Sequence, residues 1–216
     1  MGDFSLIAQI SRGLAPAICI KQAIEASALY DIPYLPVYGK ELVEAKNIAA
    51  NIALEHDSDL ILVEDDILAT SDQWGKICTM RGKVLFGRAI TRKGEWNTQK
   101  IDGKVIRSGT CFIRIPCNIL KSLDKMEKLG THIFESYDFK VINGVLEPLR
   151  PNDKGRMSDT YFWYHLMKLN PAVEEIGDVV HLETCLNRER DNKRPNEIKP
   201  FKLKDQSWKN GTPVNA

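Results

Sequence analysis

The chain has 216 residues, of which 43% are hydrophobic and 27% are charged, and its formal net charge is +1. This length fits one domain with a core of its own, and the composition is ordinary for a globular protein. The small net charge gives no overall attraction to nucleic acid or to an anionic membrane, and we expect no nucleic-acid partner. No apolar run approaches the roughly 18 residues that a membrane-spanning helix needs, and the N-terminus lacks the pattern of a signal peptide.

The cysteine pattern excludes two kinds of small-domain scaffold. There are five cysteines, and no two have Cys-x-x-Cys spacing, which argues against structural zinc and against a disulfide framework. Cys19, Cys78 and Cys111 have apolar neighbours, as buried free thiols do. We therefore expect an intracellular, cytoplasmic protein with reduced thiols.

The first 66 residues alternate between strand and helix patterns. Strands are predicted at residues 4–10, 32–37 and 59–66, and helices at 17–29 and 41–56. Pro16 suits the first turn of the first helix, and the prolines at 33 and 36 favour an edge position for the second strand. This order predicts a Rossmann-like half with parallel strands.

After residue 66 the pattern becomes mixed. Strands are predicted at 84–90, 104–107, 110–115 and 179–182, and helices from Thr70 or Ser71 to about 79, at 117–128 and from Ser158 to about 169. Residues 91–99 form a polar excursion, and Asp102-Gly103 is a strong turn signal. The second half is therefore expected to contain antiparallel strands. The segment 187–216 has eight Lys and Arg against four Asp and Glu, which indicates a surface extension or partial disorder.

The strand at 59–66 ends in three consecutive carboxylates, Glu64, Asp65 and Asp66. The four aliphatic residues before them are typical of a strand covered on both faces, and open α/β sheets bind ligands at the carboxyl ends of such strands. Three adjacent carboxylates repel one another, and a hard cation would relieve that repulsion. A solvated acidic turn is the alternative, and the run alone does not separate the two.

In this order the chain resembles a glycosyltransferase of the GT-A fold, closest to the family 2-like enzymes. Residues 45–47, Ala-Lys-Asn, resemble the family's Ala-Arg-Asn element, and 64–66 resemble its Asp-x-Asp motif with Glu in the first place. Residues 108–113, Ser-Gly-Thr-Cys-Phe-Ile, are similar to the Gly-rich segment that opens the acceptor half. Residues 157–162 look like the Glu-Asp-x-x-Phe helix start, with Ser in place of Glu. The family often adds a late metal-binding His after an apolar strand, and His181 fits that description.

The resemblance implies one GT-A domain at residues 1–186, followed by the basic C-terminal extension at 187–216. Residues 1–66 would form its nucleotide-binding half and 67–186 its acceptor half. The implied reaction moves a sugar from a nucleotide-diphospho-sugar donor to an acceptor hydroxyl. The acceptor, whether glycan, protein or lipid, stays open, as do the donor sugar and the nucleotide base.

A divalent cation, Mn²⁺ or Mg²⁺, would neutralise the diphosphate leaving group in such a reaction. We expect Asp66 and His181 as its ligands, and an imidazole ligand favours Mn²⁺. The resemblance places Glu64 and Asp65 at the donor, with Glu64 facing the nucleotide ribose or the water shell of the metal.

Asp159 is the expected base of an inverting reaction, because it lies in the first turn of a predicted helix, where the helix dipole favours a charged carboxylate. In a retaining enzyme it would have another role. Arg12 and Lys46 are expected to contact the nucleotide or its phosphates. Trp96 would either stack on an acceptor sugar or serve in packing.

Two other functions remain open. A nucleotidyltransferase shares the Rossmann-like start and the metal carboxylates, although the loop after the first strand has only one glycine, Gly13. A degenerate GT-A domain that acts as a binding or structural module is the second, since Lys46, Glu64 and Ser158 depart from the family's motifs.

Overall fold

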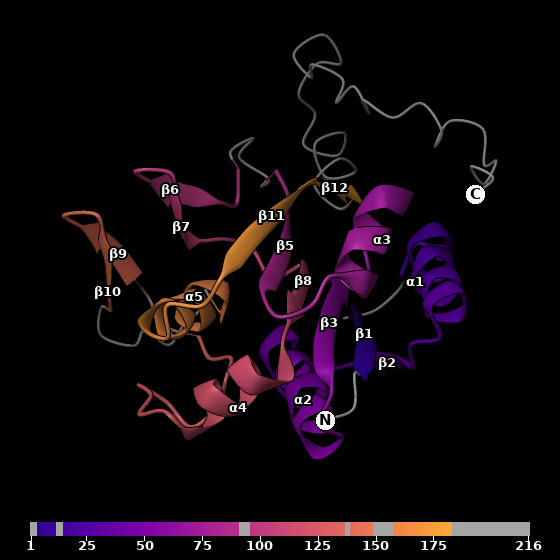
Figure 1. Cartoon of the computed structure of the whole chain (residues 1–216), viewed down its shortest axis with the longest axis horizontal. Coiled ribbons are helices and arrows are strands. Elements are labelled where there is room, and N and C mark those ends of the chain that lie inside the picture. The colour runs from indigo at the N-terminus through magenta and orange to yellow at the C-terminus, as the bar shows by residue number, and fades with distance from the viewer. Residues whose placement is uncertain (1–3, 12–14, 91–95, 137–138, 149–157, 183–216) are drawn as a thin grey trace, which may run out of the picture.

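A six-stranded mixed sheet forms the centre of the protein (Figure 1). The computed structural model describes residues 4–11, 15–90, 96–136, 139–148 and 158–182. The strand order is β11-β5-β8-β3-β1-β2. The strands and their bounds are β1 (Ser5–Ser11), β2 (Tyr34–Tyr38), β3 (Asp59–Glu64), β4 (Ile67–Leu68), β5 (Val84–Arg88), β6 (Gln99–Ile101), β7 (Lys104–Arg107), β8 (Phe112–Ile115), β9 (Phe139–Ile142), β10 (Val145–Pro148), β11 (Val173–Asp178) and β12 (Val180–His181). The helices are α1 (Ala17–Tyr30), α2 (Leu42–Glu55), α3 (Ser71–Thr79), α4 (Cys117–Lys125) and α5 (Ser158–Lys168).

The N-terminal half is parallel, as its alternating strands and helices predicted. β1 pairs with β2 on one side and with β3 on the other, and both pairings are parallel. β2 lies at the edge of the sheet, as the prolines at positions 33 and 36 predicted. α1 and α2 form the two crossovers, and Pro16 stands immediately before α1 as its N-cap.

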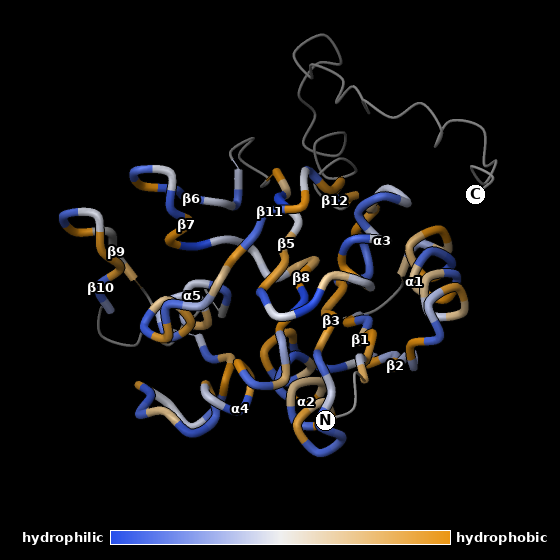
Figure 2. Tube along the Cα trace, viewed as in Figure 1, coloured by the Kyte–Doolittle hydropathy of each residue, from blue (hydrophilic) through white to orange (hydrophobic). Residues whose placement is uncertain are grey.

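Helices cover both faces of the sheet, and the alternation of side chains along β3 explains why. Leu60 and Leu62 pack into the core under α2, α4 and α5, whereas Ile61 and Val63 pack into the core under α1 and α3. All four side chains are at most 1% exposed, so each contributes roughly 2 kcal/mol of apolar burial. Figure 2 shows the resulting pattern, with hydrophobic central strands and hydrophilic stretches on the surrounding segments.

Local signals fix the boundaries of α3 and of one hairpin. Thr70 caps α3 through a capping box with Gln73, in which each residue's side chain bonds the other's backbone. Asp102 and Gly103 both have positive φ, 50° and 76°, and this type of turn joins β6 to β7. Both elements confirm the sequence prediction.

The second half is mixed, as expected. β8 runs antiparallel between β3 and β5, and β11 pairs parallel with β5 at the far edge of the sheet. β8 also carries a fully buried arginine, Arg114, whose Nη2 lies 2.6 Å from Asp59 Oδ2. The remaining donors of Arg114 reach the carbonyls of Ile77 and Cys78 and the hydroxyl of Ser5. This arginine therefore joins β8 to β3, to β1 and to α3.

The predicted last strand at 179–182 is present as the shorter β12, but the strand before it, β11, was missed. β11 ends at Asp178, one residue after Gly177, whose φ is 113°. β11 escaped notice because it is polar, with Glu174 bonded to Lys83 at 2.6 Å and Glu175 to Lys100 at 2.9 Å. An edge strand exposes one side to water, so it tolerates such residues.

A second hairpin, formed by β9 and β10, was also missed. Asn143 and Gly144 connect its strands with φ values of 50° and 79°. Asn-Gly is a strong hairpin signal, so the sequence did contain the information.

The described part of the chain contains no helix that is long and apolar enough to cross a membrane. The three buried thiols predicted from the sequence, Cys19, Cys78 and Cys111, are buried and free. The predicted tail at 187–216 lies outside the described residues.

Gly87 on β5 leaves no room for a side chain. A Cβ at this position would lie 2.6 Å from Val179 Cγ1 and 3.0 Å from Phe112 Cδ1. We predict that Gly87→Ala lowers the free energy of unfolding by about 1–3 kcal/mol, the usual result of overpacking a core. Urea denaturation would measure it.

The matched control is Gly75→Ala in α3. Its new Cβ would approach only Tyr30 Oη, at 3.2 Å, and alanine favours the helix by about 1 kcal/mol. We expect little loss of stability here. Equal losses in both variants would contradict the packing argument for Gly87.

His165 on α5 makes the fold sensitive to acid. It is 1% exposed, lies between the rings of Tyr161 and Tyr164, and has no hydrogen-bond partner for either ring nitrogen among the described residues. Burial, together with the charge of Lys168, lowers its pKa to about 4. The unfolded chain binds this proton below about pH 6.5, whereas the folded chain does not until about pH 4.

Stability should therefore fall as the pH drops from about 6.5 to about 4, and His165 should account for about 3 kcal/mol of that fall. In His165→Phe this part of the pH dependence should disappear. Denaturation curves of both proteins at pH 7 and pH 4.5 test it. An unchanged difference between the two pH values would refute the assignment to His165.

Candidate metal site and its buried lysine

Pairing of two short strands brings His181 to the acidic end of β3. β4 and β12 are antiparallel, with Ile67 opposite His181 and Leu68 opposite Val180. The Leu182 amide also donates to the Asp66 carbonyl, at 2.8 Å. Residues 115 positions apart are thereby fixed side by side by backbone bonds. Asp66 and His181 are the two residues that we expected as metal ligands.

Glu64, Asp66 and His181 form a cluster in which one potential ligand atom from each residue lies within 4.8 Å of the others. His181 Nδ1 is 3.4 Å from Asp66 Oδ2, and His181 Nε2 is 4.0 Å from Glu64 Oε2. An imidazole binds one cation through one nitrogen, so these two distances belong to alternative ligand atoms of His181. One ligand atom from each residue would have to close from within 4.8 Å to the about 3 Å that separates neighbouring ligands of an octahedral cation. Two carboxylates and one imidazole suit Mn²⁺ better than Mg²⁺. The donor set therefore fits the expected cation, with Glu64 as a third candidate ligand.

The two other acidic or basic residues expected near the donor are placed differently. Asp65 lies in the turn between β3 and β4, with its amide bonded to the Ile10 carbonyl at 3.0 Å, and is not part of the three-residue cluster. Arg12 lies outside the described residues.

Lys46 lies next to the cluster, at the centre of a hydrogen-bonded network. Its side chain is 0% exposed, and its Nζ donates to Thr110 Oγ1 at 2.7 Å and to Asp159 Oδ1 at 2.9 Å. The same Nζ is 3.0 Å from Glu64 Oε1. Burial lowers the pKa of Lys46, but the charges of Asp159 and Glu64 outweigh it, so that the pKa is raised and the ammonium stays protonated.

The network gives Lys46 protein partners where we expected nucleotide phosphates. α2 supplies the lysine because Ala45, Ala49 and Ala53 pack that helix closely against the sheet. An ammonium has three protons, and Glu64, Thr110 and Asp159 supply one acceptor for each. The contact to Asp159 spans 113 positions of sequence.

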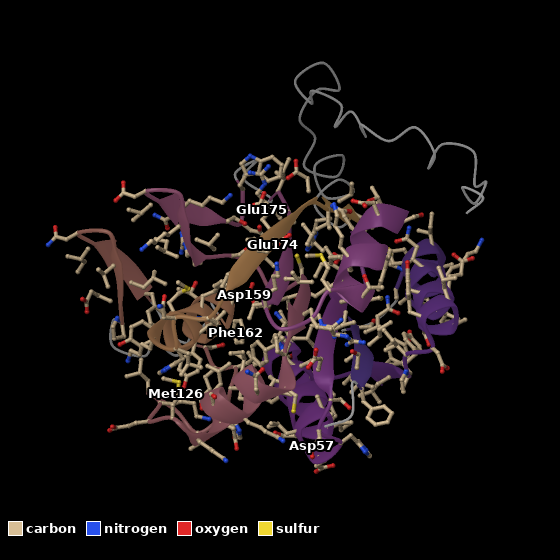
Figure 3. The ribbon with its side chains drawn as sticks, in the orientation of Figure 1. Asp57, Met126, Asp159, Phe162, Glu174 and Glu175 are labelled. Atoms are coloured by element: carbon tan, nitrogen blue, oxygen red, sulfur yellow. The ribbon has the colours of Figure 1, made fainter. Side chains whose placement is uncertain are left out.

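Asp159 lies in the first turn of α5, near the middle of the molecule (Figure 3). Its side chain is 37% exposed, whereas Lys46 and Thr110 are fully buried. Burial raises the pKa of Asp159, but the charge of Lys46 and the hydrogen bond from the Thr110 hydroxyl lower it by more. The net result is a carboxylate with a lowered pKa. Both of its side-chain hydrogen bonds fall on Oδ1, and the backbone amide of Thr110 also donates to this carboxylate.

Thr110 is the site residue that sequence reasoning missed. It precedes β8 within the Gly-rich stretch, and its hydroxyl donates to Asp159 Oδ1 and accepts from Lys46. Gly109 beside it is required by packing, because a Cβ would lie 2.1 Å from Asn97 Nδ2. The signal was available in the Gly-Thr pair, since a small residue before a hydroxyl allows close approach of another segment.

Cys111 borders the cluster but is a poor ligand candidate. Burial raises the pKa of its thiol well above the usual range, and the charges of Glu64 and Asp159 raise it further. A thiol must lose its proton to bind a metal tightly, so the oxygen and nitrogen donors are favoured.

Trp96, considered for sugar stacking or packing, is 42% exposed. The Arg88 guanidinium lies over its ring, 4.0 Å from the centroid, so one ring face is already occupied.

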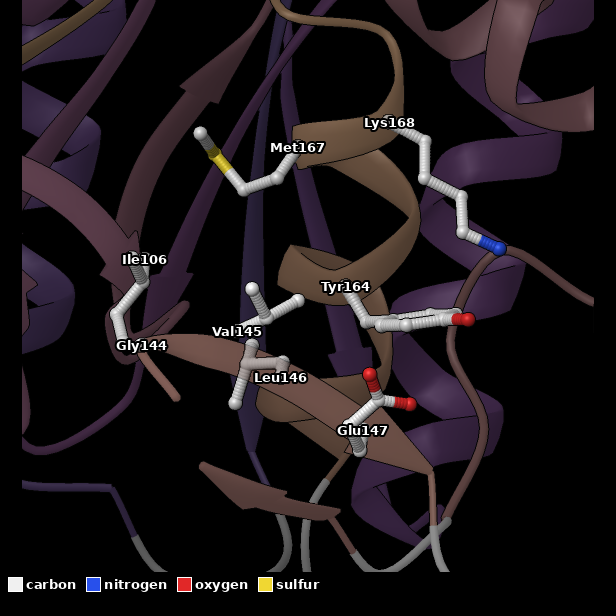
Figure 4. Close-up of a pocket in the computed structure, with 8 residues that line it drawn as sticks. All are labelled: Ile106, Gly144, Val145, Leu146, Glu147, Tyr164, Met167 and Lys168. Carbon is white, nitrogen blue, oxygen red and sulfur yellow. The ribbon is translucent and has the colours of Figure 1, made fainter. Parts of the chain in front are cut away.

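A separate hollow of about 320 Å³ lies between the β9–β10 hairpin, β7 and α5 (Figure 4). Val145 and Leu146 of β10 and Tyr164 and Met167 of α5 form much of its wall. It shares no residue with the metal cluster or with the Lys46 network.

Comparison with known proteins adds a fold likeness. No family model matches the chain, and no curated protein matches it. Among the solved structures that match is the crystal structure of A197 from STIV, with 16% sequence identity and a TM-score of 0.52. The match covers 82% of this chain and 83% of that chain. At this identity the likeness concerns the fold alone, and it agrees with a mixed α/β unit built on a six-stranded sheet.

Proposed function

We propose that the chain is a metal-dependent glycosyltransferase of the GT-A fold, which moves a sugar from a nucleotide-diphospho-sugar donor to an acceptor hydroxyl. One observation carries the proposal. The stretches on which the family resemblance depends are far apart in the sequence, yet Lys46 contacts Glu64, Thr110 and Asp159 directly, and Thr110 also contacts Asp159. Glu64 also belongs to the cluster with Asp66 and His181.

The sheet topology supports the same proposal. A parallel half, β2-β1-β3, ends in the acidic turn, and the antiparallel β8 joins it to the second half. Ligands of open α/β sheets bind at the carboxyl ends of the parallel strands. Glu64 and Asp66 occupy that position on β3 and directly after it.

The bound cation would neutralise the charge that develops on the departing diphosphate. Glu64, Asp66 and His181 would hold the cation, and Asp159, on the other side of the Lys46 network, would act on the acceptor. In an inverting reaction the acceptor oxygen bonds to the anomeric carbon as the bond from that carbon to the diphosphate breaks. Asp159 takes the proton of the acceptor hydroxyl in this step.

The electrostatic setting of Asp159 suits a late proton transfer. Its pKa is lowered, so it is ionised near neutral pH and is able to accept a proton. A weakly basic carboxylate takes that proton only when the acceptor oxygen has begun to bond to carbon and has become acidic. The hydrogen bond from Thr110 and the ion pair to Lys46 fix the carboxylate before that step.

Cation-dependent nucleotide binding is the first test. UDP, GDP, ADP and CMP are each added to the chain with and without Mn²⁺, and the melting temperature is recorded. One nucleotide, at about 100 times its dissociation constant, should stabilise the protein by about 2.7 kcal/mol, or roughly 5–10 °C, and only when Mn²⁺ is present.

Asp66→Asn should abolish that increase, because it removes a charged ligand. Asp72→Asn is the control, since Asp72 is an exposed acid on α3 that pairs with Lys76. A folded protein that no nucleotide stabilises would argue against the enzyme and for a binding or structural module.

Asp159→Asn should separate binding from chemistry. The variant should retain Mn²⁺-dependent nucleotide binding, but hydrolysis of the cognate nucleotide-sugar, with water as acceptor, should slow by about 10²- to 10⁴-fold, as for loss of a general base. Release of nucleoside diphosphate measures the rate. A nucleotidyltransferase given a nucleoside triphosphate and a sugar phosphate would join the nucleotidyl group to the sugar phosphate and release pyrophosphate, so a separate pyrophosphate assay distinguishes the two functions. Full activity of Asp159→Asn would remove it from the role of base.

A further inference from the structure

Lys46 connects the two parts of the site through a single carboxylate. Glu64 directs Oε1 to Lys46 Nζ, at 3.0 Å, and Oε2 toward His181 Nε2, at 4.0 Å. One oxygen of Glu64 therefore belongs to the buried network, and the other belongs to the metal cluster. The Lys46 ammonium and any cation bound by Glu64 therefore interact with the same carboxylate.

Negative charges outnumber positive charges around Glu64. Glu64, Asp66 and Asp159 carry three negative charges, and Lys46 supplies one positive charge with a side chain that is 0% exposed. A buried charge is screened much less than a surface charge. The ammonium must therefore repel any divalent cation that Glu64 binds and attract any anion that approaches it.

Stability alone gives no reason for this arrangement. Apolar residues of similar volume often replace buried ion pairs with no loss of stability, or with a gain. The ammonium of Lys46 is nonetheless matched to three acceptors, Thr110, Asp159 and Glu64, from three different segments. Such complete matching orients the two carboxylates with respect to each other.

We propose that Lys46 is a positioning residue that acts as an internal counter-ion of the cation site, holding Glu64 and Asp159 in place and keeping the affinity for a lone divalent cation low. The inference rests on the proposed function and deepens it. The anionic diphosphate of the donor supplies the charge that a lone cation lacks, so cation and donor are held together better than the cation alone.

Mn²⁺ binding in the absence of nucleotide tests this inference. Free Mn²⁺ is measured by electron paramagnetic resonance during titration of the full chain and of Lys46→Met. Removal of the ammonium should tighten Mn²⁺ binding about tenfold, because repulsion at short range is lost. Loss of the contact that orients Glu64 acts in the opposite direction, so tighter binding shows that the lost repulsion outweighs the lost orientation, and weaker binding overturns the counter-ion role.

Three further variants make the result specific. Lys46→Gln also removes the charge while keeping polar atoms, and should tighten Mn²⁺ binding as well. Lys46→Arg keeps the charge and should bind Mn²⁺ as the unmodified chain does. Lys40→Met removes the charge of a lysine on the surface, whose side chain is 47% exposed, and should change the affinity less than twofold.

The outcomes separate this inference from the proposed function. Binding of Mn²⁺ that depends on Asp66 but does not tighten in folded Lys46→Met or Lys46→Gln overturns the role of Lys46 alone. The absence of Mn²⁺ binding in every variant overturns the proposed cation site itself. If neither neutral variant folds, Lys46 serves the fold and the inference falls.

Discussion

Both ends of β3 carry a carboxylate that is held by a fully buried cation. Asp59, at the start of the strand, is paired with Arg114, and Glu64, at its end, is paired with Lys46. Between them the side chains of residues 60–63 are covered on both faces of the sheet. A strand so deeply buried has room for charge only at its ends, and each charge there needs a partner because an unpaired buried charge is very costly.

The two ends differ in how their cations are used. The donors of Arg114 are bound by Asp59, by two carbonyls of α3 and by Ser5, all of which are structural partners. Lys46 instead contacts two carboxylates, of which Asp159 is 37% exposed. The carboxylates at the two ends of β3 are similarly covered, since Asp59 is 17% and Glu64 13% exposed. The second end differs in that its buried cation also pairs with the more exposed Asp159.

Sequence patterns predicted the elements whose signals are local. The run of residues 59–66, the capping residue Thr70 and the Asp102-Gly103 turn each depend on neighbours within a few positions, and each is present in the structure. The same kind of signal at Asn143-Gly144 was overlooked. β11 was missed for a different reason, because its two glutamates are balanced by Lys83 and Lys100 from other segments.

The candidate site was predictable in its residue types but not in its contacts. Asp66 and His181 were expected as ligands from a motif and a late histidine, and the pairing of β4 with β12 brings them together. The contact of Lys46 with Asp159 was not foreseen, since no periodicity or spacing connects positions 113 residues apart. Nothing in a helix pattern distinguishes a lysine that faces solvent from one that is fully covered. Only the packing of α2 and α5 against the same sheet decides that.

Glu64 makes the metal cluster and the Lys46 network interdependent. Its carboxylate is the one group that they share, with one oxygen directed to each. A change in charge on either side alters the orientation and the electrostatic potential of Glu64, and therefore reaches the other side. Asp159 lies on the far side of Lys46 from Glu64, so the carboxylate expected to accept a proton is two contacts away from the residues expected to hold the cation. In the proposed reaction, the single ammonium group of Lys46 would thereby couple the leaving-group side to the acceptor side.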